Sequence, residues 1–216
     1  MNRLVITTMA KSLTIPISDE TIQSLHTGDN VLLNGVIVTG RDAAHKWLHD
    51  RFVTRNIEPD QEDLTVYEKL RSLLNGSLIY HCGPVVSGLE SGEYHFVAAG
   101  PTTSSREEPY QGDIMRHFNL KGVLGKGGMG DKTLQACQDT SSVYFHAVGG
   151  AAALIAQSVT RVLDVFKLEF GVPEAMWVIE VADLPAVVTM DTHGKSLHKE
   201  IEERSRKELA RLIESM

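Results

Sequence analysis

Two glycine-rich turns organise this sequence: Gly100-Pro101-Thr102-Thr103-Ser104-Ser105-Arg106 and, further along, Gly125-Lys126-Gly127-Gly128-Met129-Gly130. Each turn follows a strand-like apolar segment, at residues 94–99 and 123–124, and precedes a helix-like segment. Such turns expose backbone N–H groups, and each of these two also carries a cation. The pair therefore predicts an α/β fold with a pocket for a small anion, without identifying the anion.

The rest of the chain continues the alternation of strands and helices. Further strands are predicted at residues 30–39, 77–82, 142–148, 177–181 and 186–190, and helices at residues 18–25, 41–48, 64–74, 132–138 and 151–158. Capping-box spacing of Thr39 with Asp42, and of Ser104 with Glu107, predicts where two helices begin. We expect one α/β domain with a mixed sheet over residues 1–216, ending in a polar helix over about residues 195–216.

Composition excludes several classes of protein. Among 216 residues, 28 are acidic and 21 basic, which argues against a general nucleic-acid binder. Only two cysteines occur, too few for a disulfide framework or a zinc site made of cysteines alone. The N-terminal segment has no apolar core of a signal peptide, and no run of about 18 apolar residues occurs. A soluble, cytoplasmic protein without a membrane partner is expected.

The second turn also matches the dinucleotide-binding pattern G-x-G-x-x-G at Gly125, Gly127 and Gly130. That fold needs an acidic residue about twenty positions later to bind a ribose hydroxyl. Residues 144–150 contain no carboxylate, and no Gly-Lys-Ser/Thr completes a phosphate-binding loop. A nucleotide-dependent oxidoreductase is therefore a minor alternative.

Five motifs in order carry a family resemblance. They are Thr39-Gly40-Arg41-Asp42-Ala43-Ala44-His45, His81-Cys82-Gly83-Pro84, the two glycine turns, and Asp191-Thr192-His193-Gly194. From about residue 11 to 198 the chain resembles the β subunit, or C-terminal domain, of the iron–sulfur-dependent hydro-lyases, class I fumarase and L-tartrate dehydratase. The resemblance implies a swivelling β/β/α domain.

The resemblance also implies a partner and a cofactor. In this family an α subunit or N-terminal domain supplies three cysteines to a [4Fe–4S] cluster, whose open iron acts as a Lewis acid. This chain lacks such a cysteine set and is therefore expected to be the β component, with no metal ligands of its own. A hetero-oligomer with the α subunit is expected, and a homo-oligomer is the alternative for the isolated chain.

The resemblance assigns roles to five residues. Thr102 matches the proton-transfer residue, and Arg41, Thr103, Arg106 and Lys126 match positions that bind a small dicarboxylate substrate. Removal of a proton beside a carboxylate pushes negative charge into that group, and cations at its oxygens stabilise the transition state. A threonine hydroxyl is a poor base by itself, so a neighbour must activate it.

Other residues have weaker assignments. Asp42 could cap its helix or contact the site, and His45 could reach the same pocket or be packed. His81 and Cys82 resemble metal ligands, but a structural role is expected. The Asp191–Gly194 motif is expected to cap the terminal helix, and Cys137 to be a buried helix residue.

The leading function is reversible hydration of fumarate to L-malate. L-Tartrate dehydration to oxaloacetate is the alternative within the class. Residue Gly40 before Arg41 resembles the fumarases, because tartrate dehydratases more often have Cys there. A noncatalytic scaffold or regulatory subunit is the alternative from another class, and the cationic set argues against it.

Overall fold

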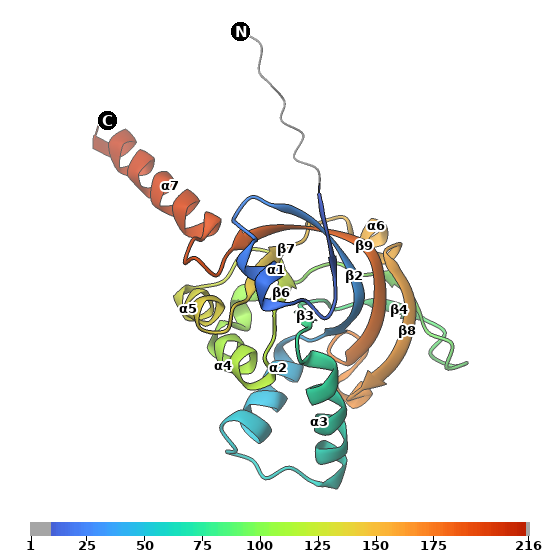
Figure 1. Ribbon diagram of the computed structural model, residues 1–216. Coiled ribbons are helices and arrows are strands. Elements are labelled where there is room, and N and C mark those ends of the chain that lie inside the picture. The colour runs from blue at the N-terminus through green and yellow to red at the C-terminus, as the bar shows by residue number, and fades with distance from the viewer. Residues whose placement is uncertain (1–9, 215–216) are drawn as a thin grey trace.

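The computed structural model describes residues 10–214, which form one large mixed sheet flanked by helices (Figure 1). The strands are β1 (Lys11–Thr14), β2 (Asn30–Thr39), β3 (Leu78–Tyr80), β4 (Val85–Ser87), β5 (His95–Ala98), β6 (Gly122–Gly125), β7 (Val143–His146), β8 (Val159–Phe166) and β9 (Met176–Met190). The helices are α1 (Asp19–Gln23), α2 (Asp42–Leu48), α3 (Gln61–Leu74), α4 (Glu108–Phe118), α5 (Asp131–Asp139), α6 (Ala152–Ala156) and α7 (Leu197–Glu214). Within this range the predicted mixed α/β fold is confirmed.

The large sheet closes on itself. Its order is β1-β2-β3-β6-β7-β9-β8, and β9 also pairs with β2. Strands β1, β2, β3, β6 and β7 are parallel, whereas β9 runs antiparallel to β2, β7 and β8. Five strands, β2, β3, β6, β7 and β9, therefore form a closed ring, and β4 and β5 make a separate hairpin-like pair.

Two irregularities allow the sheet to curl. Gly35 lies at a register shift between β2 and β9, has φ +119°, and leaves no room for a Cβ beside the Ile15 carbonyl. Asp183 in β9 also has a positive φ, 51°. Bulges of this kind bend and twist a strand, so β9 can pair with β2 and β7 at once. The sequence predicted two strands here, and the structure has one.

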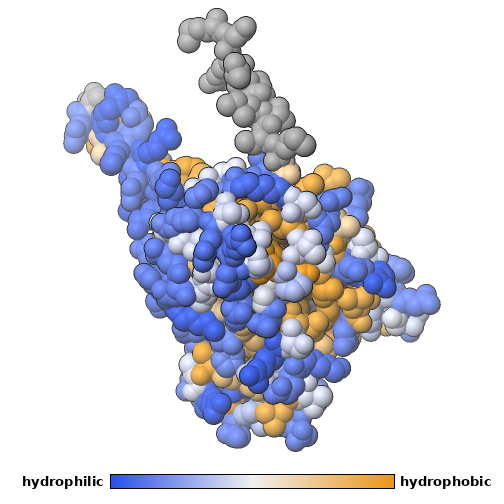
Figure 2. Space-filling model, viewed as in Figure 1, coloured by the Kyte–Doolittle hydropathy of each residue, from blue (hydrophilic) through white to orange (hydrophobic). Residues whose placement is uncertain are grey.

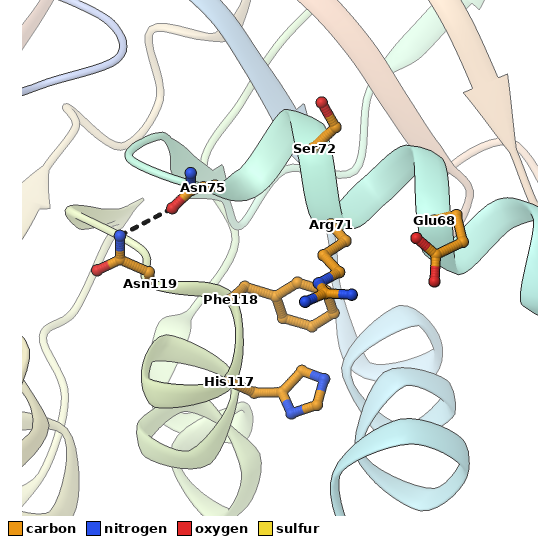
Figure 3. A pocket seen from close by; sticks show the side chains of 7 residues that line it. All are labelled: Glu68, Arg71, Ser72, Asn75, His117, Phe118 and Asn119. Carbon is orange, nitrogen blue, oxygen red and sulfur yellow. Dashed lines mark hydrogen bonds between the residues drawn. The ribbon is translucent and has the colours of Figure 1, made fainter.

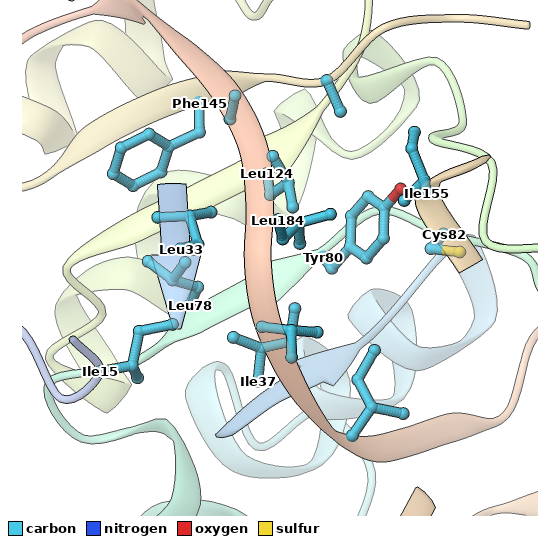
Figure 4. Packing of buried hydrophobic residues seen from close by; sticks show 14 of the residues in the cluster. Ile15, Leu33, Ile37, Leu78, Tyr80, Cys82, Leu124, Phe145, Ile155 and Leu184 are labelled. Atoms are coloured by element: carbon cyan, nitrogen blue, oxygen red, sulfur yellow. The ribbon is translucent and has the colours of Figure 1, made fainter. Parts of the chain in front are cut away.

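Alternating residues of the ring fill two hydrophobic cores. The inner core includes the buried residues Leu33, Tyr80, Leu124 and Phe145 (Figure 4). Trp177 is buried in the same core. Their sequence neighbours point outward, because successive strand side chains face opposite sides of a sheet. These outward residues form the second core against the flanking helices, with Trp47, Leu70, Ile114 and Ala136 from α2, α3, α4 and α5.

Polar surface covers most of the helical side. In Figure 2 hydrophilic side chains dominate α7, while apolar surface is visible toward β8 and β9. Helix α7 projects from the body (Figure 1), and none of its residues is buried. Within residues 10–214, no helix combines the length and apolarity needed to span a membrane.

Helix caps account for several differences from the sequence-based expectation. Ser18 caps α1 as its acidic first turn predicts, but Arg41 and Glu107, the N-cap residues of α2 and α4, make no capping hydrogen bond with their own side chains. The Thr39 hydroxyl instead donates to the Ala175 carbonyl, and the predicted Ser104 cap is replaced by a short 3₁₀ turn at Ser104–Arg106. Strand β8 was not predicted.

The Asp191–Gly194 motif builds the turn before α7 and does not cap it. Asp191 accepts backbone hydrogen bonds from His193 and Lys195, and its other oxygen accepts from Thr27. Ser196, just ahead of α7, accepts at its hydroxyl from the Lys199 N–H at 3.4 Å. The expected capping role therefore belongs to Ser196. Cys137 is buried in α5, as predicted.

Candidate active site

The predicted site residues gather where neighbouring parallel strands end. Arg41 follows β2, His81 follows β3, Lys126 follows β6, and β7 ends at His146. In open α/β sheets, ligands bind beyond the carboxyl ends of the strands. The closed sheet of this protein presents the same kind of edge.

The first glycine turn lies across this edge and joins the two predicted turns. The Thr102 N–H donates to the His81 carbonyl at 2.8 Å, and the Lys126 N–H donates to the Thr102 carbonyl at 3.3 Å. Thr103 pairs with Lys126 in an isolated parallel bridge, and the Ser104 N–H donates to the Lys126 carbonyl. The backbone thus places the Thr102 and Thr103 side chains next to the Lys126 turn.

The Thr102 side chain is hydrogen bonded to Arg106, which belongs to the same glycine turn. The Arg106 guanidinium donates from Nη2 to the Thr102 hydroxyl oxygen at 2.7 Å. Arg106 Nε also lies 3.5 Å from the Asp42 carboxylate, which brings the first turn of α2 into the site. A guanidinium at a hydroxyl oxygen stabilises the deprotonated form, so Arg106 is the neighbour that can activate Thr102.

Arg41 is positioned by a glycine and an acid. A Cβ at Gly83 would lie 2.3 Å from Arg41 Nη1, so the guanidinium packs directly on the glycine backbone. Arg41 Nη2 pairs with Glu174 at 3.2 Å, and the other Glu174 oxygen accepts from the Ala43 N–H at 3.1 Å. Glu174 therefore fixes Arg41 and caps α2. The sequence did not reveal Glu174, because it lies far along the chain, just before β9.

The side chains of Lys126 and Thr103 are available to bind a ligand. Lys126 is half-buried, and no acid among residues 10–214 lies within ion-pair distance of its ammonium group. Thr103 is exposed, and its hydroxyl has no hydrogen-bond partner in the described part of the chain. Both groups can bind an incoming anion without breaking an existing contact.

A network of buried, hydrogen-bonded side chains lies next to the site residues. The Gln111 carboxamide lies 2.8 Å from Nε2 of both His45 and His81, through the oxygen assigned as Oε1. His81 Nδ1 lies 2.8 Å from the Ser104 hydroxyl, which lies 2.8 Å from the Tyr144 hydroxyl. The network joins α2, β3, α4, β7 and the first glycine turn.

The positions of the protons in this network follow from the hydrogen-bond donors and acceptors that its members offer. Burial lowers the pKa of both His45 and His81, so each ring is neutral with one proton. His45 Nδ1 must donate to the Arg41 carbonyl, which can only accept, so its Nε2 is an acceptor. Gln111 therefore satisfies both rings when its NH₂ group, otherwise without a partner, faces them. His45 is fully buried and lies beneath Arg41 instead of in the open pocket.

The N-terminus of α5, the helix after the second glycine turn, already binds a carboxylate side chain. Glu108 accepts from the backbone N–H groups of Gly130, Lys132 and Thr133 at 2.8–3.2 Å. This carboxylate occupies the α5 N-terminus, where a dinucleotide fold binds a pyrophosphate. The nucleotide alternative therefore fails on geometry as well as on the missing ribose acid.

A separate cleft of about 510 Å³ lies between α3 and α4 (Figure 3). Arg71 and His117 approach it from the two helices, and the Asn119 amide donates to Asn75 at 2.8 Å. It contains no predicted site residue. This cleft is therefore separate from the candidate site.

Comparison with known proteins places the chain in a family. A family model described as fumarase C-terminus matches residues 5–201. The chain belongs to this family.

Two relatives illustrate its range. A Geobacillus stearothermophilus protein named "Putative fumarate hydratase class I" is 50% identical over 203 residues, covering 94% of this chain and 36% of that protein. The L(+)-tartrate dehydratase subunit beta of Escherichia coli K12 is 36% identical over 190 residues, covering 88% and 87% respectively. This fumarase C-terminus chain therefore spans about a third of the first relative and most of the second.

The described residues do not fit an iron–sulfur cluster. No group of three His, Cys, Asp or Glu side chains within residues 10–214 is arranged to hold a metal ion. Cys82 and Cys137 are fully buried, and burial raises the pKa of each thiol to about 12, so neither offers a thiolate. The family is iron–sulfur dependent in general, but this member's described residues supply no ligand set.

Proposed function

We propose that this chain is the catalytic β component of an iron–sulfur hydro-lyase that hydrates fumarate reversibly to L-malate. The observation that carries the proposal is the gathering of Arg41, Thr102, Arg106 and Lys126 at one edge of the sheet. A scaffold subunit has no need of cations held in this arrangement.

Each residue has a defined task in the proposal. Arg41 and Lys126 bind substrate carboxylate oxygens, Arg41 through paired donors and Lys126 as a compact charge. In dehydration the deprotonated Thr102 oxygen takes the proton from the carbon beside a carboxylate, and the neighbouring carbon releases its hydroxyl group as hydroxide. In hydration hydroxide adds to that carbon, and the Thr102 hydroxyl returns the proton to the other. Arg106 stabilises that oxygen, and its remaining N–H groups face the charge that develops on the substrate. Thr103 donates a hydrogen bond to the substrate.

We assign the [4Fe–4S] cluster to an α component, because this chain offers no ligands for it. The coverage of the relatives agrees with this division. The chain matches only 36% of the fumarate hydratase relative, so most of that protein has no counterpart here. The proposed assembly is a hetero-oligomer of α and β components in the cytoplasm.

L-Tartrate dehydration is the second candidate. Its support is the length match, since a tartrate dehydratase β subunit is covered over 87% of its length. The higher identity to the fumarate hydratase relative, 50% against 36%, favours fumarate.

Anaerobic reconstitution of the chain with its α component, iron and sulfide tests the proposal. We expect turnover of fumarate and L-malate by the complex and none by either component alone. Turnover of tartrate without fumarate or malate would establish the second candidate. Full activity of the α component alone would exclude a catalytic role for this chain.

A further inference from the structure

The carboxyl groups of Asp42 and Glu107 lie within hydrogen-bonding distance of each other at the N-terminal ends of α2 and α4, and Asp42 also pairs with Arg106. Asp42 lies in the first turn of α2, and its side chain is 47% exposed. Glu107 precedes α4 and is fully buried. The resemblance assigned no role to Glu107.

Both oxygens of Glu107 lack a hydrogen-bond donor among the described residues. A buried carboxylate without donors is strongly disfavoured, because its charge loses the solvation that water provides. Two carboxylates cannot bond to each other, since both only accept. A single proton removes the conflict, because a protonated Glu107 can donate to Asp42.

The surrounding groups determine which carboxyl holds the proton. Burial, with the hydrogen bond to Asp42 and its negative charge, raises the pKa of Glu107 to about 8. Burial also raises the pKa of Asp42, but the bond to Glu107 and the charges of Arg106 and Arg41 lower it further, for a net decrease. The proton therefore belongs on Glu107 and the negative charge on Asp42.

The other polar groups near the pair are not alternative partners. Arg106 pairs with Asp42 and not with Glu107 in the described structure. His45 faces the Arg41 carbonyl and Gln111, and its pKa is lowered by burial. Tyr144 hydrogen bonds with Ser104.

We propose that Glu107 is a positioning residue that keeps a proton in the folded protein, donates it in a hydrogen bond to Asp42, and thereby holds Arg106 against Thr102. The contacts form a line from Glu107 through the Asp42 carboxylate and the Arg106 guanidinium to the Thr102 hydroxyl. The role in turnover rests on the proposed function, whereas the proton on Glu107 does not.

Carboxyl titration of the full chain by carbon-13 NMR tests the proton directly. We expect one carboxyl to titrate near pH 8, to be missing in Glu107→Gln, and to remain in the exposed control Glu90→Gln. Titration of Glu107 in the usual range of glutamates, near 4.5, would overturn the proposal.

The Arg106 Nε–H signal tests the positioning. It should be resolved and slowly exchanging in the wild type and in Glu107→Gln, whose amide can still donate to Asp42. It should be lost in Glu107→Leu, which cannot donate. A signal that persists in a folded Glu107→Leu protein would overturn the positioning role.

Turnover by the reconstituted complex gives the functional readout. Glu107→Gln should keep near wild-type kcat at neutral pH, whereas Glu107→Leu should lower kcat by about tenfold with less change in KM. An equal loss in both variants would contradict the proposal. If no complex turns over either substrate, the proposed function fails, and the two NMR measurements still decide the role of Glu107.

Discussion

At Thr102 the hydroxyl oxygen already accepts a hydrogen bond from Arg106 at 2.7 Å. In the proposed function, this contact provides the neighbour that activates Thr102 as a base, and that neighbour lies four residues further along the same segment. Half-burial of Thr102 keeps the hydroxyl accessible to a ligand while limiting its contact with water. In the proposed function, Arg106 therefore acts both on Thr102 and on the negative charge that develops on the substrate.

Thr102→Ala should leave assembly intact and lower kcat by about 100-fold or more, the usual contribution of a general base. Thr103→Ala is the matched control. It removes an exposed hydroxyl from the same turn, and should raise KM with a smaller effect on kcat. Steady-state kinetics of the reconstituted complex measures both. Wild-type kcat in Thr102→Ala would remove this residue from the mechanism.

The pKa of Glu107 makes stability depend on pH. Between its ordinary value of 4.5 and the raised value of about 8, only the folded state holds the proton. The free energy of unfolding of the wild type should therefore fall, relative to Glu107→Gln, as pH rises through this window, and level off above it. Urea unfolding at several pH values measures the difference. A difference that is constant with pH would contradict the prediction.

At the scale of elements, the loop after β3 presents Gly83 to the loop after β2, where Arg41 lies. A methyl group at Gly83 would collide with the guanidinium, whose flexible end can move away. Gly83→Ala should therefore weaken binding of a dicarboxylate by about tenfold, while the free energy of unfolding changes by less than about 1 kcal/mol, the scale of a surface ion pair. Gly149→Ala is the control, because its Cβ would make an ordinary 3.5 Å contact with Lys126. Equal KM values for the two variants would contradict the role of Gly83.

Gln111 connects three elements through its carboxamide. Gln111→Leu leaves the Nε2 atoms of His45 and His81 buried without a partner, which should cost about 1–3 kcal/mol of unfolding free energy. The exposed Gln157→Leu substitution should change it by less than about 0.5 kcal/mol. Chemical denaturation measures both. Matching values would show that the network does not stabilise the fold.

The sequence predicted elements wherever the local pattern coincides with burial. Strand β2 was predicted at its observed bounds because its apolar run contributes to both hydrophobic cores. Cap predictions failed at Thr39 and Ser104 because their hydroxyls bond to residues distant in the sequence. Strand β8 was missed because it is an edge strand with many exposed residues.

The candidate site also contains residues that could be predicted from the sequence and residues that could not. The family motifs identified the residues at the strand ends, because each motif is a short run of residues that are close together in the sequence. Glu174 and Gln111 could not be found in this way, because only the closed sheet and the packing of α4 bring them to Arg41 and His81. Glu107 had a local signal, its position directly after Arg106, but only burial reveals its unpaired oxygens.

On the scale of the whole molecule, helix α7 projects from the α/β body (Figure 1). We propose that residues 1–216 form one domain, with α7 as an appendage. The family match ends at residue 201, near the start of α7. His198, at the base of α7, packs on Gly128 and lies 3.0 Å from the Thr189 hydroxyl, so this base belongs to the body.

Removal of residues 203–216 should therefore shift the midpoint of thermal unfolding by no more than about 2 °C, because no α7 residue is buried and surface changes cost little. Truncation after Gly194 also removes Ser196 and His198, and should lower the midpoint by several times as much. Calorimetry of the two truncated chains beside the full chain measures the contrast. A large decrease in the unfolding midpoint after removal of residues 203–216 would show that the projecting part of α7 stabilises the body. Equal decreases for the two truncated chains would show that the base of α7 adds no stability.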